Sequence, residues 1–253
     1  MFRIDLNSDL GESFGVYRME GDEEIIKYVT SVNVACGWHA GDPMVMERTV
    51  KLAKKYGAGI GAHPSYPDLL GFGRRKMVLS AHEIKNYIKY QVGALNAFVQ
   101  SEGLKLQHVA PHGALGNACQ YDREIARAIC EAVCEIDQEL MIYYCAGAVL
   151  GEEADRIGLK SASEIFADRA YEDDLSLVSR AKPGSMITDE EEAVARSIRM
   201  VKEGRVRTLS GKDAAIKGDT LCVHGDGPKA MAFVKKICRA FEQEGIEIKN
   251  IKQ

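Results

Sequence analysis

Patterns typical of strands and helices alternate about seven times along this chain of 253 residues, and this alternation restricts the fold more than any other feature. Leu140–Cys145 is a continuous apolar run, typical of a strand covered on both faces. The segment holding Ile84, Ile88 and Val92 instead has helical spacing. Such alternation implies parallel strands joined by right-handed crossovers. We therefore predict one α/β domain over residues 1–253, a (β/α) barrel of seven or eight units, with an open doubly wound sheet as the alternative.

The predicted strands are short apolar runs, and several end in Gly, Pro, Asp or His. They are Phe2–Leu6, Ser31–Cys36, Ala58–Ala62, Leu106–Ala110, Leu140–Cys145, Ser163–Ala167 and Thr220–Val223, with Arg205–Leu209 and Ile246–Ile251 as two further candidates. Helix starts are marked by Asp42 before Pro43, by Ser80 with Glu83 three residues later, and by Thr188.

Composition argues against several classes of protein. A net charge of −4 gives no excess of positive charge, so we expect neither nucleic acid nor an anionic membrane as a partner. No apolar stretch is long enough to cross a bilayer, and we expect no signal peptide because Arg3 and Asp5 interrupt the start. Seven scattered cysteines without a CxxC pair predict a reduced, cytoplasmic protein with free and mostly buried thiols.

Polar side chains gather where the predicted strands end, and barrel enzymes build their sites at those carboxyl ends. Four of the six histidines follow a predicted strand, in segments that also contain Gly or Pro: His39, His63, His112 and His224. The other two, His82 and His108, are interpreted as structural. The same strand ends carry Asp5, Asn7, Asp9, Glu12, Asp42, Asp68, Asp168, Arg169 and Asp226. Packing alone explains such a set poorly, so the sequence predicts a polar pocket.

This residue set is compatible with more than one chemistry. Histidine and carboxylate together permit general acid–base catalysis near neutral pH. The same groups could hold a divalent metal, with Asp9, His39 and His63 as candidate ligands, although no HExxH motif is present. Arg74, Arg75 and Arg169 could pair with a substrate carboxylate or phosphate, and surface salt bridges are the alternative for the first two.

Several familiar motifs are missing. Asp5, Asn7 and Asp9 suit the start of a calcium-binding loop, but Leu10 and Val16 stand where that loop needs its Gly and its final Glu. The chain has no GxSxG, no GxxxxGK[ST] and no GxGxxG after a strand. A serine nucleophile is therefore poorly supported, and the sequence does not reveal a nucleotide site.

The strand-end segments resemble the LamB/YcsF family, the A subunits of prokaryotic 5-oxoprolinase. The resemblance covers nearly the whole chain and rests on DLNSDLGESFG (5–15), NVACGWHAGDP (33–43), GAHPSYPDLLGFGRR (61–75), PHGALGN (111–117), FADRAY (166–171) and CVHGDG (222–227). It implies a distorted TIM-like barrel related to glycoside hydrolase and deacetylase barrels. It also implies opening of the 5-oxo-L-proline lactam to L-glutamate together with B and C subunits, with ATP as co-substrate yielding ADP and phosphate.

Site residues carry over from the matched segments. The catalytic set is Asp5, Asp9, Glu12, His39 and His63, and the substrate-binding set is Asn7, Asp42, Arg74, Arg75, His112, Asp168, Arg169, His224 and Asp226. Two positions depart from the family pattern Lys-Pro-His-Gly-Ala-Leu-Tyr-Asn, because Ala110 replaces the Lys and Gly116 the Tyr. The alternatives are a metal-dependent amide hydrolase or deacetylase acting alone, and a non-catalytic substrate-binding subunit.

Overall fold

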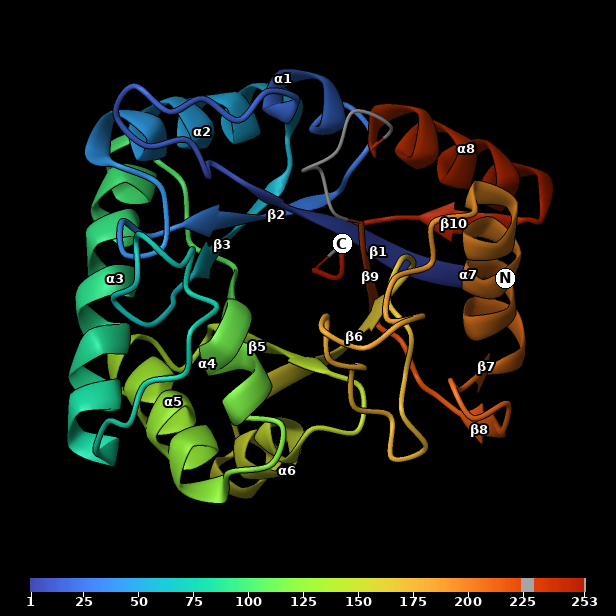
Figure 1. Ribbon diagram of the computed structural model, residues 1–253. Helices are drawn as coiled ribbons and strands as arrows, with labels where there is room; N and C mark the ends of the chain where they lie inside the picture. The colour runs from blue at the N-terminus through green and yellow to red at the C-terminus, as the bar shows by residue number, and fades with distance from the viewer. Residues whose placement is uncertain (224–229, 253) are drawn as a thin grey trace.

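Parallel strands close into a barrel at the centre of the molecule, with helices around it (Figure 1). The structure is a computed structural model that describes residues 1–223 and 230–252. Within these residues the ring runs through β1 (Phe2–Leu10), β2 (Ser31–Ala35), β3 (Gly59–His63), β4 (His108–Val109), β5 (Met141–Cys145), β6 (Lys160–Phe166) and β9 (Thr220–Cys222). Because β9 pairs with both β6 and β1, the predicted barrel is confirmed and the open sheet is excluded.

The long helices cover the outside of the ring, and α3 packs against α5, which packs against α6. Their bounds are α2 (Pro43–Tyr56), α3 (Ala81–Ser101), α5 (Arg123–Ile136), α6 (Val149–Ile157), α7 (Glu190–Glu203) and α8 (Ala230–Gln243), with short helices at α1 (Asp22–Ile25) and α4 (Gly113–Ala118). The caps predicted at Asp42 and Ser80 are confirmed. The cap predicted at Thr188 is wrong by one residue, because the Asp189 carboxylate accepts the bond from the Glu192 amide.

Three short strands lie outside the ring. β7 (Arg205–Arg207) and β8 (Asp213–Ala215) form an antiparallel hairpin, so the predicted strand at 205–209 does not join the barrel. The predicted tail strand is present as β10 (Ile246–Ile248), which pairs with the first residues of β1. β1 extends four residues beyond the predicted Leu6, since its polar residues find buried partners inside the barrel.

The apolar core lies between the strands and the helices, while the barrel interior is polar. Along β1, Leu6 and Leu10 belong to the apolar core, whereas Asp5 and Asn7 are buried in hydrogen bonds to neighbouring strands. This alternation follows from the two-residue period of a strand. No helix in residues 1–223 and 230–252 is long and apolar enough to span a membrane.

Candidate active site

A ladder of buried polar side chains, joined by hydrogen bonds, runs through the barrel interior toward the carboxyl ends of the strands. At the bottom, the Asp5 carboxylate accepts hydrogen bonds from Ser31 Oγ and Thr220 Oγ1, both at 2.6 Å. Burial raises the pKa of Asp5, and the hydroxyl bonds oppose that shift. Its carboxylate is occupied by these neighbours and does not line the cavity described below, so the structure gives Asp5 a place beneath the site.

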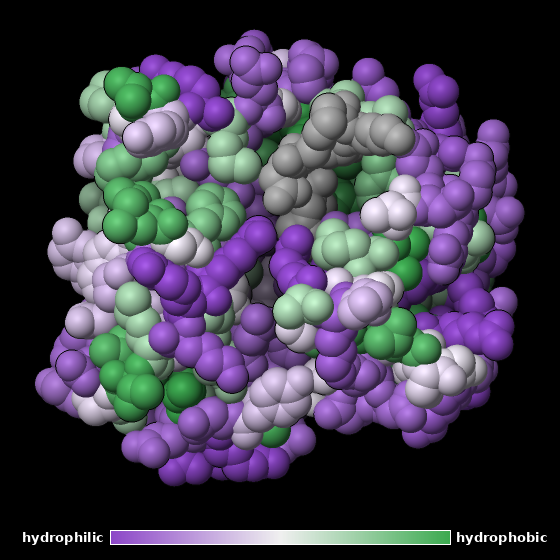
Figure 2. All heavy atoms as spheres, in the orientation of Figure 1, coloured by the Kyte–Doolittle hydropathy of each residue, from purple (hydrophilic) through white to green (hydrophobic). Residues whose placement is uncertain are grey.

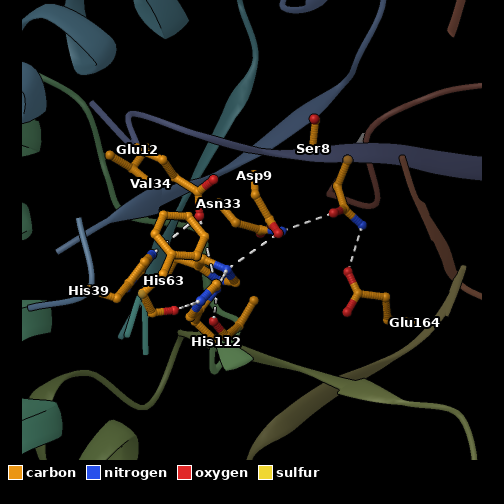
Figure 3. Close-up of polar contacts among 12 residues, drawn as sticks. Ser8, Asp9, Glu12, Asn33, Val34, His39, His63, His112 and Glu164 are labelled. Carbon is orange, nitrogen blue, oxygen red and sulfur yellow. Dashed lines mark hydrogen bonds and ion pairs between the residues drawn. The ribbon is translucent and has the colours of Figure 1, made fainter. Parts of the chain in front are cut away.

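Asn33 is the branch point of the ladder (Figure 3). Its amide nitrogen donates to Asn7 Oδ1 and to Asp9 Oδ1, each at 2.9 Å, and its Oδ1 lies 2.6 Å from His108 Nε2. Burial lowers the pKa of His108 to about 3, so the neutral ring donates from Nε2. Asn7 itself donates to Glu164 and Thr220 and, like Asp5, does not line the cavity.

His108 packs flat on Tyr143, with ring centres 3.8 Å apart. A Cβ added at Gly61, the residue that pairs with His108 on the neighbouring strand β3, would lie 2.0 Å from His108 Nε2. A glycine is therefore required there, and the placement of His108 agrees with the structural role predicted for it.

Above this ladder, three histidines and one glutamate converge at the carboxyl ends of the first strands. His63 ends β3, His39 lies between β2 and α2, His112 precedes α4 and Glu12 follows β1. One ring nitrogen from each histidine and one Glu12 oxygen all lie within 4.8 Å of one another. All three histidines are buried, whereas Glu12 is half-buried.

The closest contacts in this group join ring nitrogens to carboxylates and to each other. His39 Nε2 lies 3.3 Å from Glu12 Oε1, and His63 Nε2 lies 3.4 Å from Asp9 Oδ2. His112 Nδ1 lies 2.9 Å from His63 Nε2 and 3.9 Å from Glu12 Oε1. The sequence therefore predicted a convergence that the geometry confirms for Asp9, Glu12, His39, His63 and His112, although their chemical roles stay predictions.

Two backbone carbonyls orient two of these rings. His63 Nδ1 donates to the Ala110 carbonyl at 2.6 Å, and His112 Nε2 donates to the Phe72 carbonyl at 2.9 Å. A carbonyl only accepts, so in the neutral rings the hydrogens sit on those nitrogens. The other nitrogens, His63 Nε2 and His112 Nδ1, then face each other with lone pairs.

The three rings differ in how readily they accept a proton. Burial lowers the pKa of His39 well below its usual value and that of His112 to about 3. Burial also opposes a charge on His63, but Asp9 and Glu12 together outweigh it and raise the pKa of that ring. His63 is therefore the ring in this group that most readily carries a charge.

An open cavity of about 430 Å³ lies over the cluster, and Figure 2 shows hydrophilic side chains meeting around a hollow in this face. Its walls carry charges of both signs: Asp9, Glu12 and Glu164 against Arg74, Lys76, Arg169 and Arg180. Ala110 and Gly116, where the chain departs from the family pattern, also line it. Both departures therefore change the wall of the cavity.

Arg169 is the buried cation of this cavity. Its Nη2 donates to the Val178 carbonyl at 2.7 Å, while its Nε is buried without a hydrogen-bond partner among the described residues. Burial lowers the pKa of the guanidinium to about 10, which leaves it charged at neutral pH. A buried cation with a spare donor can pair with an anionic group of a ligand.

Other predicted binding residues lie elsewhere. Asp42 caps α2 and accepts from the Gly15 amide at 2.7 Å, and Arg75 Nε donates to Asp68 at 2.8 Å. Neither Asp42, Arg75 nor Asp168 lines the cavity. The predicted residues His224 and Asp226 lie outside the described residues.

Sequence reasoning missed Glu164, which lines the cavity and accepts from Asn7 at 3.0 Å. Its signal was a carboxylate inside a predicted strand, followed directly by the apolar residues Ile165 and Phe166.

Comparisons with known proteins give consistent matches over the whole chain. The LamB/YcsF family model matches residues 4–253. A protein from Clostridium beijerinckii, named as the A subunit of 5-oxoprolinase, is 55% identical over 98% of this chain and 97% of its own length. The protein of the same name from Pyrococcus abyssi is 53% identical over 99% of this chain and 98% of its own.

Solved structures agree with these relatives. The crystal structure of a lactam utilization protein from Thermus thermophilus has a TM-score of 0.92 and 46% identity, covering 98% of this chain and 99% of that one. A putative cellobiose-phosphate cleavage protein from Enterococcus faecalis has a TM-score of 0.57 at 13% identity, with 99% and 98% coverage, and shares the fold alone.

Proposed function

Because this chain belongs to the LamB/YcsF family, we propose that it is the A subunit of an ATP-dependent 5-oxoprolinase. It opens the lactam of 5-oxo-L-proline to L-glutamate while ATP becomes ADP and phosphate. The observation that carries this proposal is the nearly full-length identity of 53–55% to proteins named as A subunits of 5-oxoprolinase. The polar cavity at the carboxyl end of the barrel supports it, since barrel enzymes build their sites there.

The reaction needs a water that attacks the ring carbonyl, a cation that pairs with the substrate carboxylate, and a source of free energy. Water adds its oxygen to the ring carbonyl carbon, the bond between this carbon and the ring nitrogen breaks, and the nitrogen takes up protons to become the amine of glutamate. A five-membered lactam is a stable amide, so ring opening is coupled to ATP, whose hydrolysis consumes a second water. Transfer of the terminal phosphate of ATP to the amide oxygen, with release of ADP, would make the carbonyl carbon easier to attack. Water attack and ring opening would then leave an acyl phosphate of glutamate, which the second water hydrolyses to glutamate and phosphate.

Residues of the cavity suit the two ends of this substrate. Asp9 and Glu12, with His39 and His63, lie where a water could be held and deprotonated. Arg169, with its spare buried donor, suits the substrate carboxylate, and Arg74 lines the same cavity. Asp5 and Asn7 would then position the ladder beneath the site.

The B and C subunits belong to the same proposal, because the names of the relatives describe one subunit of a larger enzyme. ATP binding by the assembled enzyme belongs to this proposal as well, and the chain itself carries no GxxxxGK[ST] loop. A cytoplasmic location is also proposed, and the seven free cysteines fit a reducing compartment.

Glutamate release from 5-oxoproline and ATP tests the proposal, using this chain assembled with its candidate B and C subunits. Release that stops when this chain is omitted, or when it carries Asp9→Ala, is the expected result. The matched control is Asp155→Ala, which removes an exposed carboxylate on α6. Absence of release from the assembled complex would contradict the proposal and favour a non-catalytic binding role. Release by this chain alone, without ATP, would favour an amide hydrolase.

A further inference from the structure

Two of the clustered histidines are held with acceptor atoms facing each other. The Ala110 and Phe72 carbonyls accept the N–H groups of His63 and His112, so in the neutral rings His63 Nε2 and His112 Nδ1 face each other with lone pairs 2.9 Å apart. Two acceptors at that separation repel unless a proton or a cation lies between them. Backbone carbonyls that fix the far nitrogen of each ring are the outer-shell arrangement found around metal-binding histidines.

The number of ligand atoms in this cluster favours a metal cation over a single bridging proton. A single proton bridges two atoms, whereas here four atoms from Glu12, His39, His63 and His112 converge within 4.8 Å.

We propose that His63, His112 and Glu12, with His39 as a fourth ligand, form a binding site for one divalent transition-metal ion. Bonds of about 2.0–2.2 Å in a tetrahedral zinc site place ligands about 3.3 Å apart. Three of the separations, 2.9 Å, 3.3 Å and 3.9 Å, bracket that value, and all four atoms lie within 4.8 Å of one another. Imidazole nitrogens with one carboxylate oxygen suit zinc or cobalt better than magnesium or calcium.

His39 is the adaptable member of this ligand set. Its ring stacks on His112 with centres 3.8 Å apart and an angle of 5° between the planes. Two parallel rings cannot both aim an in-plane lone pair at one ion, so the His39 ring tilts when the ion binds. His63 and His112, whose far nitrogens are fixed by carbonyls, therefore contribute more to affinity than His39.

The ion would be reachable from the cavity, because Glu12, His63 and His112 line its wall. If only His63, His112 and Glu12 bind the ion, its fourth tetrahedral position faces the cavity and could supply a metal-bound hydroxide near neutral pH or polarise a carbonyl, whereas binding of His39 would close that position. This inference goes beyond the proposed function, since it concerns the isolated chain and requires neither lactam nor partner subunits.

Titration of the isolated chain with Zn²⁺ and Co²⁺, after removal of metal by a chelator, tests the site. We expect one ion per chain by calorimetry and elemental analysis, with a visible absorption band for Co²⁺. His63→Ala and His112→Ala should weaken binding at least about 100-fold, the upper range for altered ligand environments, and His39→Ala less. The control is His82→Ala, which removes an exposed histidine at the start of α3.

Circular dichroism of each variant confirms that its fold is retained, and His63→Gln with His112→Gln replaces the alanines if it is not. Zinc binding well below one ion per chain, or unchanged affinity in the His63 and His112 variants, would overturn the metal site. Because no lactam or ATP is present, this failure can occur while glutamate release by the full complex persists, and the reverse is also true.

Discussion

Asn33→Ala should be among the most destabilising single substitutions in the barrel interior. The Asn33 side chain makes three hydrogen bonds, of which those to Asn7 and His108 are buried and the one to Asp9 is partly buried. At about 1 kcal/mol each these bonds contribute about 3 kcal/mol, and buried partners left unsatisfied add to the loss. We expect a decrease of about 3–5 kcal/mol in the free energy of unfolding. For a chain of this size each kcal/mol lowers the melting temperature by roughly 2–4 °C.

Urea unfolding followed by circular dichroism measures this loss. Asn86→Ala is the matched control, because Asn86 is exposed on α3 and its side chain bonds only to His82 among the described residues. That control should change stability by less than about 0.5 kcal/mol. Asn33→Asp keeps the volume but turns the donor toward Asn7 and Asp9 into an acceptor, so it should also destabilise. Equal stability of Asn33→Ala and Asn86→Ala would refute the reasoning that this ladder holds the barrel together.

Three further predictions concern the ladder and the cavity. Burial raises the pKa of Asp5 in the folded protein above its usual value of 3.8, so the folded protein loses stability as pH rises from 3.8 through the raised pKa. Asp5→Asn cannot ionise, and its free energy of unfolding should therefore increase relative to the parent over that window. A constant difference between the two proteins in urea titrations from about pH 3.5 to 7 would contradict this prediction. Gly61→Ala should lower the free energy of unfolding by about 1–3 kcal/mol, because the new Cβ clashes with the His108 ring. The control Gly93→Ala, where a Cβ on α3 meets no atom within 4 Å, should instead raise it by about 0.5–1 kcal/mol. Similar melting temperatures of the two variants would refute the clash at Gly61. Arg169→Gln should raise the KM for 5-oxoproline about 10- to 100-fold in the assembled complex, because Arg169 lines the cavity. The control Arg75→Gln should change the KM little, since Arg75 bonds to Asp68 outside the cavity. An unchanged KM in Arg169→Gln would show that Arg169 does not bind the substrate.

The fold followed from features that are local in sequence. Apolar runs and helical stripes repeat along the chain, and crossovers between parallel strands have one hand, so a barrel was predictable without contacts. The ring size was not, because closure depends on β9 pairing with β1, which lies at the other end of the chain. The same holds for the hairpin of β7 and β8, whose short strands look like barrel strands in sequence.

The site was predictable as a place but not as a set of contacts. Strand ends meet at one mouth of a parallel barrel, so His39, His63 and His112 were correctly brought together. The strand period also put Asp5 and Asn7 on the same side as Asp9, but only the register shows that those two are occupied by neighbouring strands.

Sequence alone therefore determined the chemistry that is available and the end of the barrel where it lies, because both depend on residue type and on periods of two and about 3.6 residues. Only the tertiary structure decided which atoms of these residues face one another in the site and which are held by neighbouring groups. The Phe72 and Ala110 carbonyls fix the His112 and His63 rings, and they come from other segments of the chain. Long-range partners of this kind depend on strand register and loop path, which no local pattern specifies.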